Sequence, residues 1–124
     1  MNTLIWILQS LIAFIFLYSG INKSIFSEQK LVASGQTGVE GLPLAVIRFI
    51  GITEILGAIG IILPYYLGIY PILTPISAIC FAIIMVFAGW IHYQRKEFKN
   101  VFLNAGLFIV CLFIAYYRFN YFFN

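Results

Sequence analysis

The stretch Leu42 to Leu63 reads LPLAVIRFIGITEILGAIGIIL, and the rest of the chain is interpreted outward from it. At about 1.5 Å per residue, a helix of this length crosses the roughly 30 Å hydrocarbon core of a bilayer. Glu54 lies near its middle, where a carboxylate costs about 2.5–3.5 kcal/mol to insert, so it should face protein and not lipid. Gly51, Gly57 and Ala58 fall on the same helical face as Glu54. Small residues let neighbouring helices approach closely, so we predict that this face packs against another helix and encloses the acid.

The composition of the 124 residues excludes a water-soluble domain. Apolar residues make up 63%, charged residues 9%, and the mean hydropathy is +1.03. A soluble domain carries about 25% charged residues. Because domains typically hold about 100–150 residues, we expect residues 1–124 to form a single domain in the lipid bilayer. The net charge of +3 is interpreted as a signal of membrane topology, and binding to nucleic acid is not expected.

Apolar runs predict four membrane spans, at about residues 3–22, 42–63, 70–91 and 100–117. Pro64 is expected to end the second span, because proline breaks the hydrogen-bond ladder of a helix. Residues 24–41 are the only polar stretch of any length, and they are compatible with a short amphipathic helix at the membrane interface. The sequence therefore predicts an all-α integral membrane protein, a bundle of four transmembrane helices.

The basic residues are distributed unequally between the two ends of these spans. The first and third connections lie on the same side of the membrane, whereas the opposite side carries only Arg118. The positive-inside rule places both connections in the cytoplasm and both termini outside it. The five basic residues of the two connections are Lys23, Lys30, Arg95, Lys96 and Lys99.

Polar side chains gather in the half of the bundle next to these two connections. We predict that six of them line a vestibule that narrows toward Glu54: Asn22, Lys23, Arg48, Glu54, His92 and Asn104. Glu54 is the best candidate for a proton-active residue, and the alternative is a structural ion pair with Arg48 or Lys23. Arg48 lies about 120° around the helix from Glu54, so pairing between helices is easier than pairing along one. Arg118 is interpreted as an interfacial anchor.

Short motifs also occur in a fixed order along the four spans. They are Ser19-Gly20-Ile21-Asn22-Lys23 at the end of the first span, GITEILGA at 51–58, Pro64, His92 and Arg118. In this order they resemble the DoxX-like family of small four-helix bacterial membrane proteins. The resemblance implies a four-helix fold in the bacterial cytoplasmic membrane, with helix packing at Gly20. It also implies a link to oxidoreductases, since relatives include membrane subunits of a thiosulfate:quinone oxidoreductase and of a thiol-detoxification complex.

Three functions remain open at this stage. The preferred one is a small accessory or assembly subunit that docks with a membrane protein partner or with further copies of itself. The second is a subunit of a membrane oxidoreductase that binds a quinone or a lipid, and the third is a proton-coupled transporter of a small solute. The sequence has no cofactor motif and no metal-ligand spacing, so a self-sufficient enzyme is not favoured. Cys80 and Cys111 are expected to be inert, because free cysteine commonly packs as a small hydrophobe.

Overall fold

The structure, a computed structural model, describes residues 2–123 and the side chains of residues 2–120. Its elements are α1 (Asn2–Ile25), α2 (Glu28–Ala33), the 3-10 helix η1 (Thr37–Val39), α3 (Leu44–Leu67), α4 (Leu73–Gln94) and α5 (Phe98–Phe123), with no strand in this range. Four of these helices, α1, α3, α4 and α5, are long and apolar enough to span a membrane. A helix satisfies all its backbone polar groups internally, which the hydrocarbon core requires. The predicted all-α bundle of four candidate spans is therefore confirmed.

The expectation that Pro64 ends the second span is wrong. The helix α3 continues to Leu67 and ends at Gly68, which adopts a left-handed conformation with φ of 72°. Pro64 has no N–H to donate to the carbonyl of Gly60. The hydroxyl of Thr74, on α4, instead donates to that carbonyl at 3.2 Å and accepts the N–H of Tyr65 at 3.2 Å. A side chain from the neighbouring helix thus replaces the lost backbone bond, and the helix tolerates the proline.

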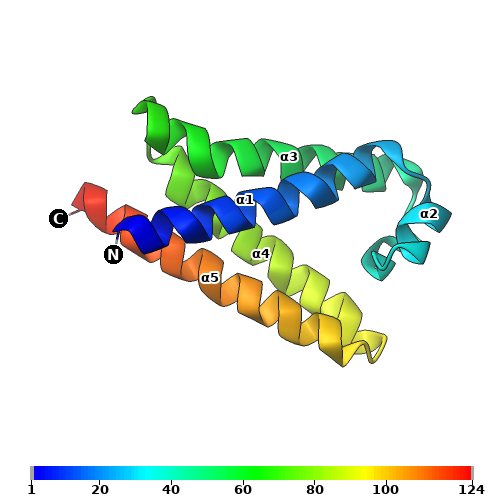
Figure 1. Cartoon of the computed structure of the whole chain (residues 1–124). Helices are drawn as coiled ribbons and strands as arrows, with labels where there is room; N and C mark the ends of the chain where they lie inside the picture. Colours follow the sequence, from blue (N-terminus) through cyan, green and yellow to red (C-terminus); the bar gives the residue numbers. More distant parts are fainter. Residues whose placement is uncertain (1, 124) are drawn as a thin grey trace.

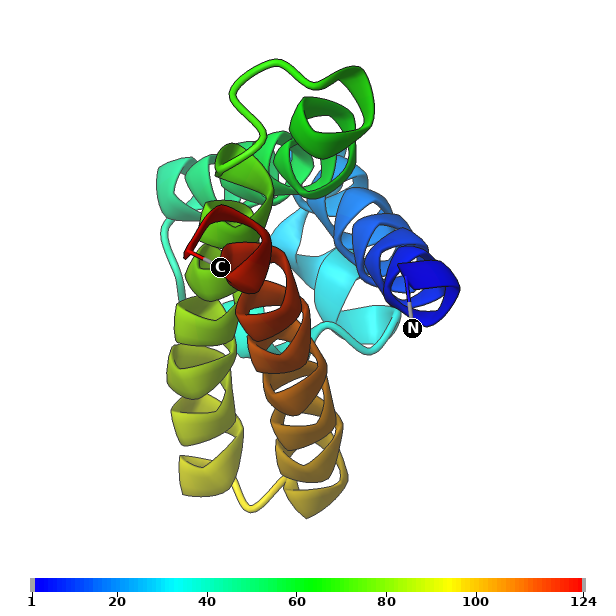
Figure 2. The ribbon, with the colours of Figure 1, turned by 90° about the vertical axis from the view of Figure 1, so that its left-hand side faces the viewer.

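The four long helices form two pairs, α1 with α3 and α4 with α5 (Figures 1 and 2). Glycines set the close approach within the first pair. A Cβ atom added to Gly20 would lie 2.6 Å from the carbonyl oxygen of Gly51, and one added to Gly51 would lie 2.8 Å from that of Gly20. Such distances are too short for any side chain, so only glycine allows the two backbones to pack this closely.

The two pairs lie close together at the end that holds both termini, and they diverge toward the other end (Figure 1). A common hydrophobic core joins them where they are close. The rings of Phe16, on α1, and Phe81, on α4, stack at 3.9 Å between centroids within this core. The remaining buried members are Ile12, Ile61, Ala78, Ala82, Met85, Cys111, Ile114 and Ala115.

The connection between α1 and α3 lies at the diverging end, together with the α4–α5 turn (Figure 1). A short helix was expected in this polar stretch, and α2 is present there, capped at its start by Ser27, whose side chain accepts the N–H of Lys30. Leu31, Val39 and Ile47 form a small second core beneath the connection. This core holds η1 against the start of α3, so the connection is a packed structure.

Candidate functional site

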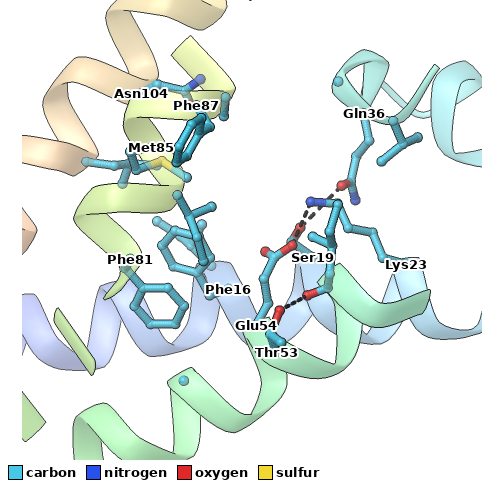
Figure 3. Close-up of a pocket in the computed structure, with 18 of the residues that line it drawn as sticks. Phe16, Ser19, Lys23, Gln36, Thr53, Glu54, Phe81, Met85, Phe87 and Asn104 are labelled. Atoms are coloured by element: carbon cyan, nitrogen blue, oxygen red, sulfur yellow. Dashed lines mark hydrogen bonds and ion pairs between the residues drawn. The ribbon is translucent and has the colours of Figure 1, made fainter. Parts of the chain in front are cut away.

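A cavity of about 860 Å³ lies between the two helix pairs, at the end where they diverge (Figure 3). Its walls come from α1, α3, α4, α5 and the α1–α3 connection, and most of its lining is apolar. The stacked rings of Phe16 and Phe81 lie at its inner end, toward the common core. Phe81 also fills the space beside Gly57, where an added Cβ would lie 2.6 Å from the ring. Neither Phe16 nor Phe81 was among the predicted site residues.

An ion pair forms the most polar part of the cavity wall. The ammonium Nζ of Lys23, in the last turn of α1, lies 2.6 Å from Oε1 of Glu54 on α3. The side chain of Lys23 is 16% exposed and that of Glu54 is 2% exposed. Gly51 and Ala58, which flank Glu54 on its helical face, are both buried. The close approach at Gly20 brings α1 near enough for Lys23 to reach the acid.

Arg48 has a different position from the predicted one. Its Nη1 donates to two backbone carbonyls at the end of α1. One is that of Lys23, within the last turn, at 2.8 Å, and the other is that of Phe26, just beyond the helix, at 2.6 Å. The last carbonyls of a helix have no partner within the helix, so Arg48 satisfies groups that would otherwise be unpaired. It does not line the cavity. Arg48 therefore fixes the backbone that carries Lys23.

His92 lines the outer end of the cavity, where its Nδ1 lies 3.0 Å from Oε1 of Glu97. The hydroxyl of Thr37, on η1, donates to Oε2 of Glu97 at 2.7 Å. These hydrogen bonds from His92 and Thr37 lower the pKa of Glu97 below its ordinary value of 4.5. Arg95 adds hydrogen bonds to the carbonyls of Thr37 and Glu40. The α4–α5 turn is thus bonded to the α1–α3 connection, and the two together cover the end of the cavity.

Asn104, on α5, lines the cavity on the wall opposite Glu54 and Lys23 (Figure 3). Its amide nitrogen is buried and has no hydrogen-bond partner among the described residues. A buried donor without a partner costs about 1–3 kcal/mol. Asn22, by contrast, does not line the cavity. Of the six residues predicted to form a vestibule, the structure therefore places Lys23, Glu54, His92 and Asn104 around one cavity.

Further uncharged polar residues line this cavity that were not among the predicted vestibule residues, and three of them lie on the side of the ion pair. They are Ser19, Gln36 and Thr53 (Figure 3). The hydroxyl of Ser19 donates to Oε1 of Gln36 at 3.2 Å, which ties the α1–α3 connection to α1. Ser19 precedes Lys23 by one helical turn, and this spacing is a signal that could have found it. Gln36 lies in an irregular segment, where helical periodicity gives no guidance.

A second polar cluster lies at the opposite end of the bundle, and it corrects the interpretation of Arg118 as an interfacial anchor. Arg118 is only 1% exposed. Its Nε donates to Oε1 of the buried Gln9 at 2.7 Å, and its Nη1 donates to Oδ1 of Asn2 at 2.9 Å. The guanidinium also lies 4.1 Å from the ring centroid of Tyr65 and 5.0 Å from that of Trp6. Gln9 was the available signal, since it is an amide within an otherwise apolar run.

The two cysteines differ in their surroundings. Cys80, on α4, is exposed and lines the cavity, whereas Cys111, on α5, is buried in the common core. Both are free thiols. Their chemical inertness remains a prediction.

Comparison with known protein families shows which family the chain belongs to. Residues 7–114 match the DoxX-like family. The chain belongs to the DoxX-like family. The match begins inside α1 and ends inside α5, so it takes in α3, α4 and both connections. No curated protein and no solved structure matched the chain.

Proposed function

We propose that this DoxX-like protein is a small binding subunit of the membrane. It takes an amphiphilic molecule, an isoprenoid quinone or a lipid, into its cavity and docks with a partner protein that acts on that molecule. One observation carries the proposal: an apolar cavity of about 860 Å³ whose wall holds the Lys23–Glu54 ion pair.

The size and lining of the cavity suit an amphiphile. Ligand pockets have volumes of about 300–1,000 Å³, are mostly apolar and contain a few polar groups that fix the orientation of the ligand. Here the apolar part runs along the spans, and the ion pair lies toward the end where they diverge. An isoprenoid or acyl chain would occupy the apolar part, and its head would approach Lys23 and Glu54.

The cavity is also suited to entry from the bilayer. Several residues of its wall are themselves largely exposed. Phe49 and Leu56 on α3 are 68% and 62% exposed, and Phe87 on α4 is 66% exposed. In a membrane this surface meets lipid, so an amphiphile could enter sideways between α3 and α4.

The partner in this proposal follows from the small amount of chain outside the spans. Between the candidate spans, the described chain consists only of short connections, one of which contains α2. These short connections leave little surface for chemistry in the aqueous phase, which supports a role for a partner protein. Transport of a solute is less well supported, because the core of Ile12, Phe81 and Ile114 closes the bundle beyond the inner end of the cavity.

The test is purification in lipid nanodiscs, followed by mass spectrometry of the extracted small molecules and of co-purified proteins. Thr53→Phe fills the cavity, whereas Ile109→Phe adds a ring to an outward-facing position that is already 65% exposed. We expect a stoichiometric amphiphile with the wild type and with Ile109→Phe, and its loss from Thr53→Phe. An empty wild type, or equal occupancy in Thr53→Phe, contradicts the proposal.

A further inference from the structure

We infer that the ligand of this cavity is an amphiphile without net charge, held at its head through a carbonyl, ester or hydroxyl oxygen. The inference rests on the proposed function and narrows it, because it separates neutral amphiphiles from anionic phospholipids and fatty acids.

The charges on the cavity wall are already balanced. Lys23 and Glu54 are the only Lys, Arg, Asp or Glu residues in the lining, and they pair with each other at 2.6 Å. Among the described residues of the wall, the other titratable side chains are the thiol of Cys80 and His92, and His92 pairs with Glu97. An anionic head would have to compete with Glu54 for Lys23, and it would leave one of the two anions unpaired in an apolar site. Burial of an unpaired charge is strongly unfavourable, so the site should select against such a head.

The polar groups that remain on the wall are uncharged. Asn104 faces the ion pair from the opposite wall, and its amide nitrogen has no partner among the described residues (Figure 3). The terminal torsion of asparagine is broad, so its amide can turn and present either an N–H donor or a carbonyl acceptor. Ser19 and Thr53 add hydroxyl groups on the side of the ion pair. The N–H of Asn104 can donate to a neutral oxygen atom of a head group. The hydroxyls of Ser19 and Thr53 already donate to Gln36 and to the carbonyl of Ile50, and they can still accept a hydrogen bond from a hydroxyl group of the head.

The basic residues that could attract anionic lipids lie elsewhere. Lys30, Lys96 and Lys99 are exposed at the diverging end, and none of them lines the cavity. Anionic head groups would therefore gather on the outer surface, where exposed charges remain hydrated. Because the unpaired basic residues lie outside the cavity, we expect the cavity to distinguish two lipids that differ only in a phosphate group.

The experiment measures saturable binding of dioleoylglycerol and of the phosphatidic acid with the same acyl chains, to the full chain in nanodiscs of phosphatidylcholine. We expect dioleoylglycerol to bind about tenfold more tightly or better. Glu54→Gln leaves Lys23 as an uncompensated cation, so the preference should shift at least about tenfold toward phosphatidic acid. The double variant Lys23→Met, Glu54→Gln should restore the preference for the neutral lipid.

Asn104→Leu provides a second measurement that leaves the ion pair intact. It should weaken binding of dioleoylglycerol about fivefold, the effect of one hydrogen bond to a neutral oxygen. Gln29→Leu removes an exposed amide on α2, outside the cavity, and should leave binding unchanged. Equal or tighter binding of phosphatidic acid to the wild type, or no shift in Glu54→Gln, overturns the inference while leaving the proposed function standing. Absence of saturable binding for both lipids overturns the proposed function for lipids, and the co-purification experiment above then tests it for a quinone.

Discussion

Lys23 and Glu54 belong to different spans, and their charged groups meet at 2.6 Å inside the bundle. Three features of the chain bring them together. Gly20 and Gly51 let α1 and α3 approach closely, and Arg48 holds the backbone at the end of α1 through the carbonyls of Lys23 and Phe26. The ion pair is therefore a product of helix packing, and it fixes the register of α1 against α3.

The first prediction concerns the stability of this pair. Removal of one partner of a buried ion pair costs about 3–5 kcal/mol, because the other charge is left uncompensated. Glu54→Gln should cost less than that, since Lys23 is 16% exposed and its long chain can carry the ammonium toward the membrane surface. Lys23→Met should cost more, because Glu54 cannot move in this way. The double variant should be more stable than Lys23→Met. The unfolding free energies of the three variants can be measured in mixed micelles. If the cost of the double variant equals the sum of the two single costs, the ion pair is contradicted.

The second prediction tests the close approach of α1 and α3. Gly20→Ala should lower the melting temperature strongly, at a cost of about 1–3 kcal/mol, because the new methyl group would meet the backbone of Gly51. Gly106→Ala is the matched control, since no atom lies within 4 Å of a Cβ added there. That control should be neutral or slightly stabilising, because alanine favours a helix more than glycine does. Similar melting temperatures for the two variants would contradict the observed packing.

The fold class could be predicted because a bilayer allows few structures. Long apolar runs must form helices in lipid, and polar residues within them must face protein, as Glu54 does. The register between helices could not be predicted in the same way. Arg48 and Lys23 were both candidate partners for Glu54, and the choice depends on the backbone geometry around Gly20. Helical periodicity describes one helix at a time, so it gives no such distances.

Two further features of the structure could not be predicted from the sequence, for related reasons. The continuation of α3 past Pro64 depends on the hydroxyl of Thr74, on another helix, and nothing in the second span indicates it. The burial of Arg118 likewise depends on Gln9, at the far end of the chain. Each case joins two positions through tertiary packing, and single-sequence patterns do not contain that information.

The third prediction concerns membrane orientation. The structure places the α1–α3 connection and the α4–α5 turn at one end of the bundle (Figure 1). Because these segments carry most of the basic residues outside the spans, we expect that end to face the cytoplasm. A reporter that is active only in the cytoplasm should be silent when fused after residue 124 and active when inserted after Lys96. The opposite pattern would invert this orientation and place the end of the cavity that holds Lys23 and Glu54 on the outer side.

The fourth prediction is a dependence on pH that arises from Glu97. The folded-state pKa of Glu97 is lowered, chiefly by hydrogen bonds from His92 and Thr37, so the unfolded state binds more protons between the two pKa values. The stability that Glu97 contributes is therefore fully present above its ordinary value of 4.5 and is lost as the pH falls through the lower folded value. Melting curves from about pH 3 to pH 7 should show this loss. Glu97→Gln should flatten that part of the profile, whereas Glu40→Gln, which changes an exposed acid of the α1–α3 connection, should preserve it.

The last prediction concerns Arg118, a buried cation that no carboxylate among residues 2–120 pairs with. Two kinds of contact compensate its charge. Its planar guanidinium group donates to the amide oxygens of Gln9 and Asn2, and the face of this group lies over the ring of Tyr65. Hydrogen bonds to charged groups contribute about 1.5–3 kcal/mol, and cation–π contacts about 0.5–2 kcal/mol.

Lysine cannot reproduce this arrangement, because its ammonium is a compact point charge without a flat face. Arg118→Lys should therefore destabilise the chain by about 2–4 kcal/mol, nearly as much as Arg118→Met. The double variant Arg118→Met, Gln9→Leu should recover part of the loss, because it leaves neither partner unpaired. Lys99→Met, at an exposed cation, should change the unfolding free energy by no more than about 0.5 kcal/mol. A neutral effect of Arg118→Lys would mean that charge alone matters at this position, and the hydrogen bonds to Gln9 and Asn2 would then be only a consequence of the packing.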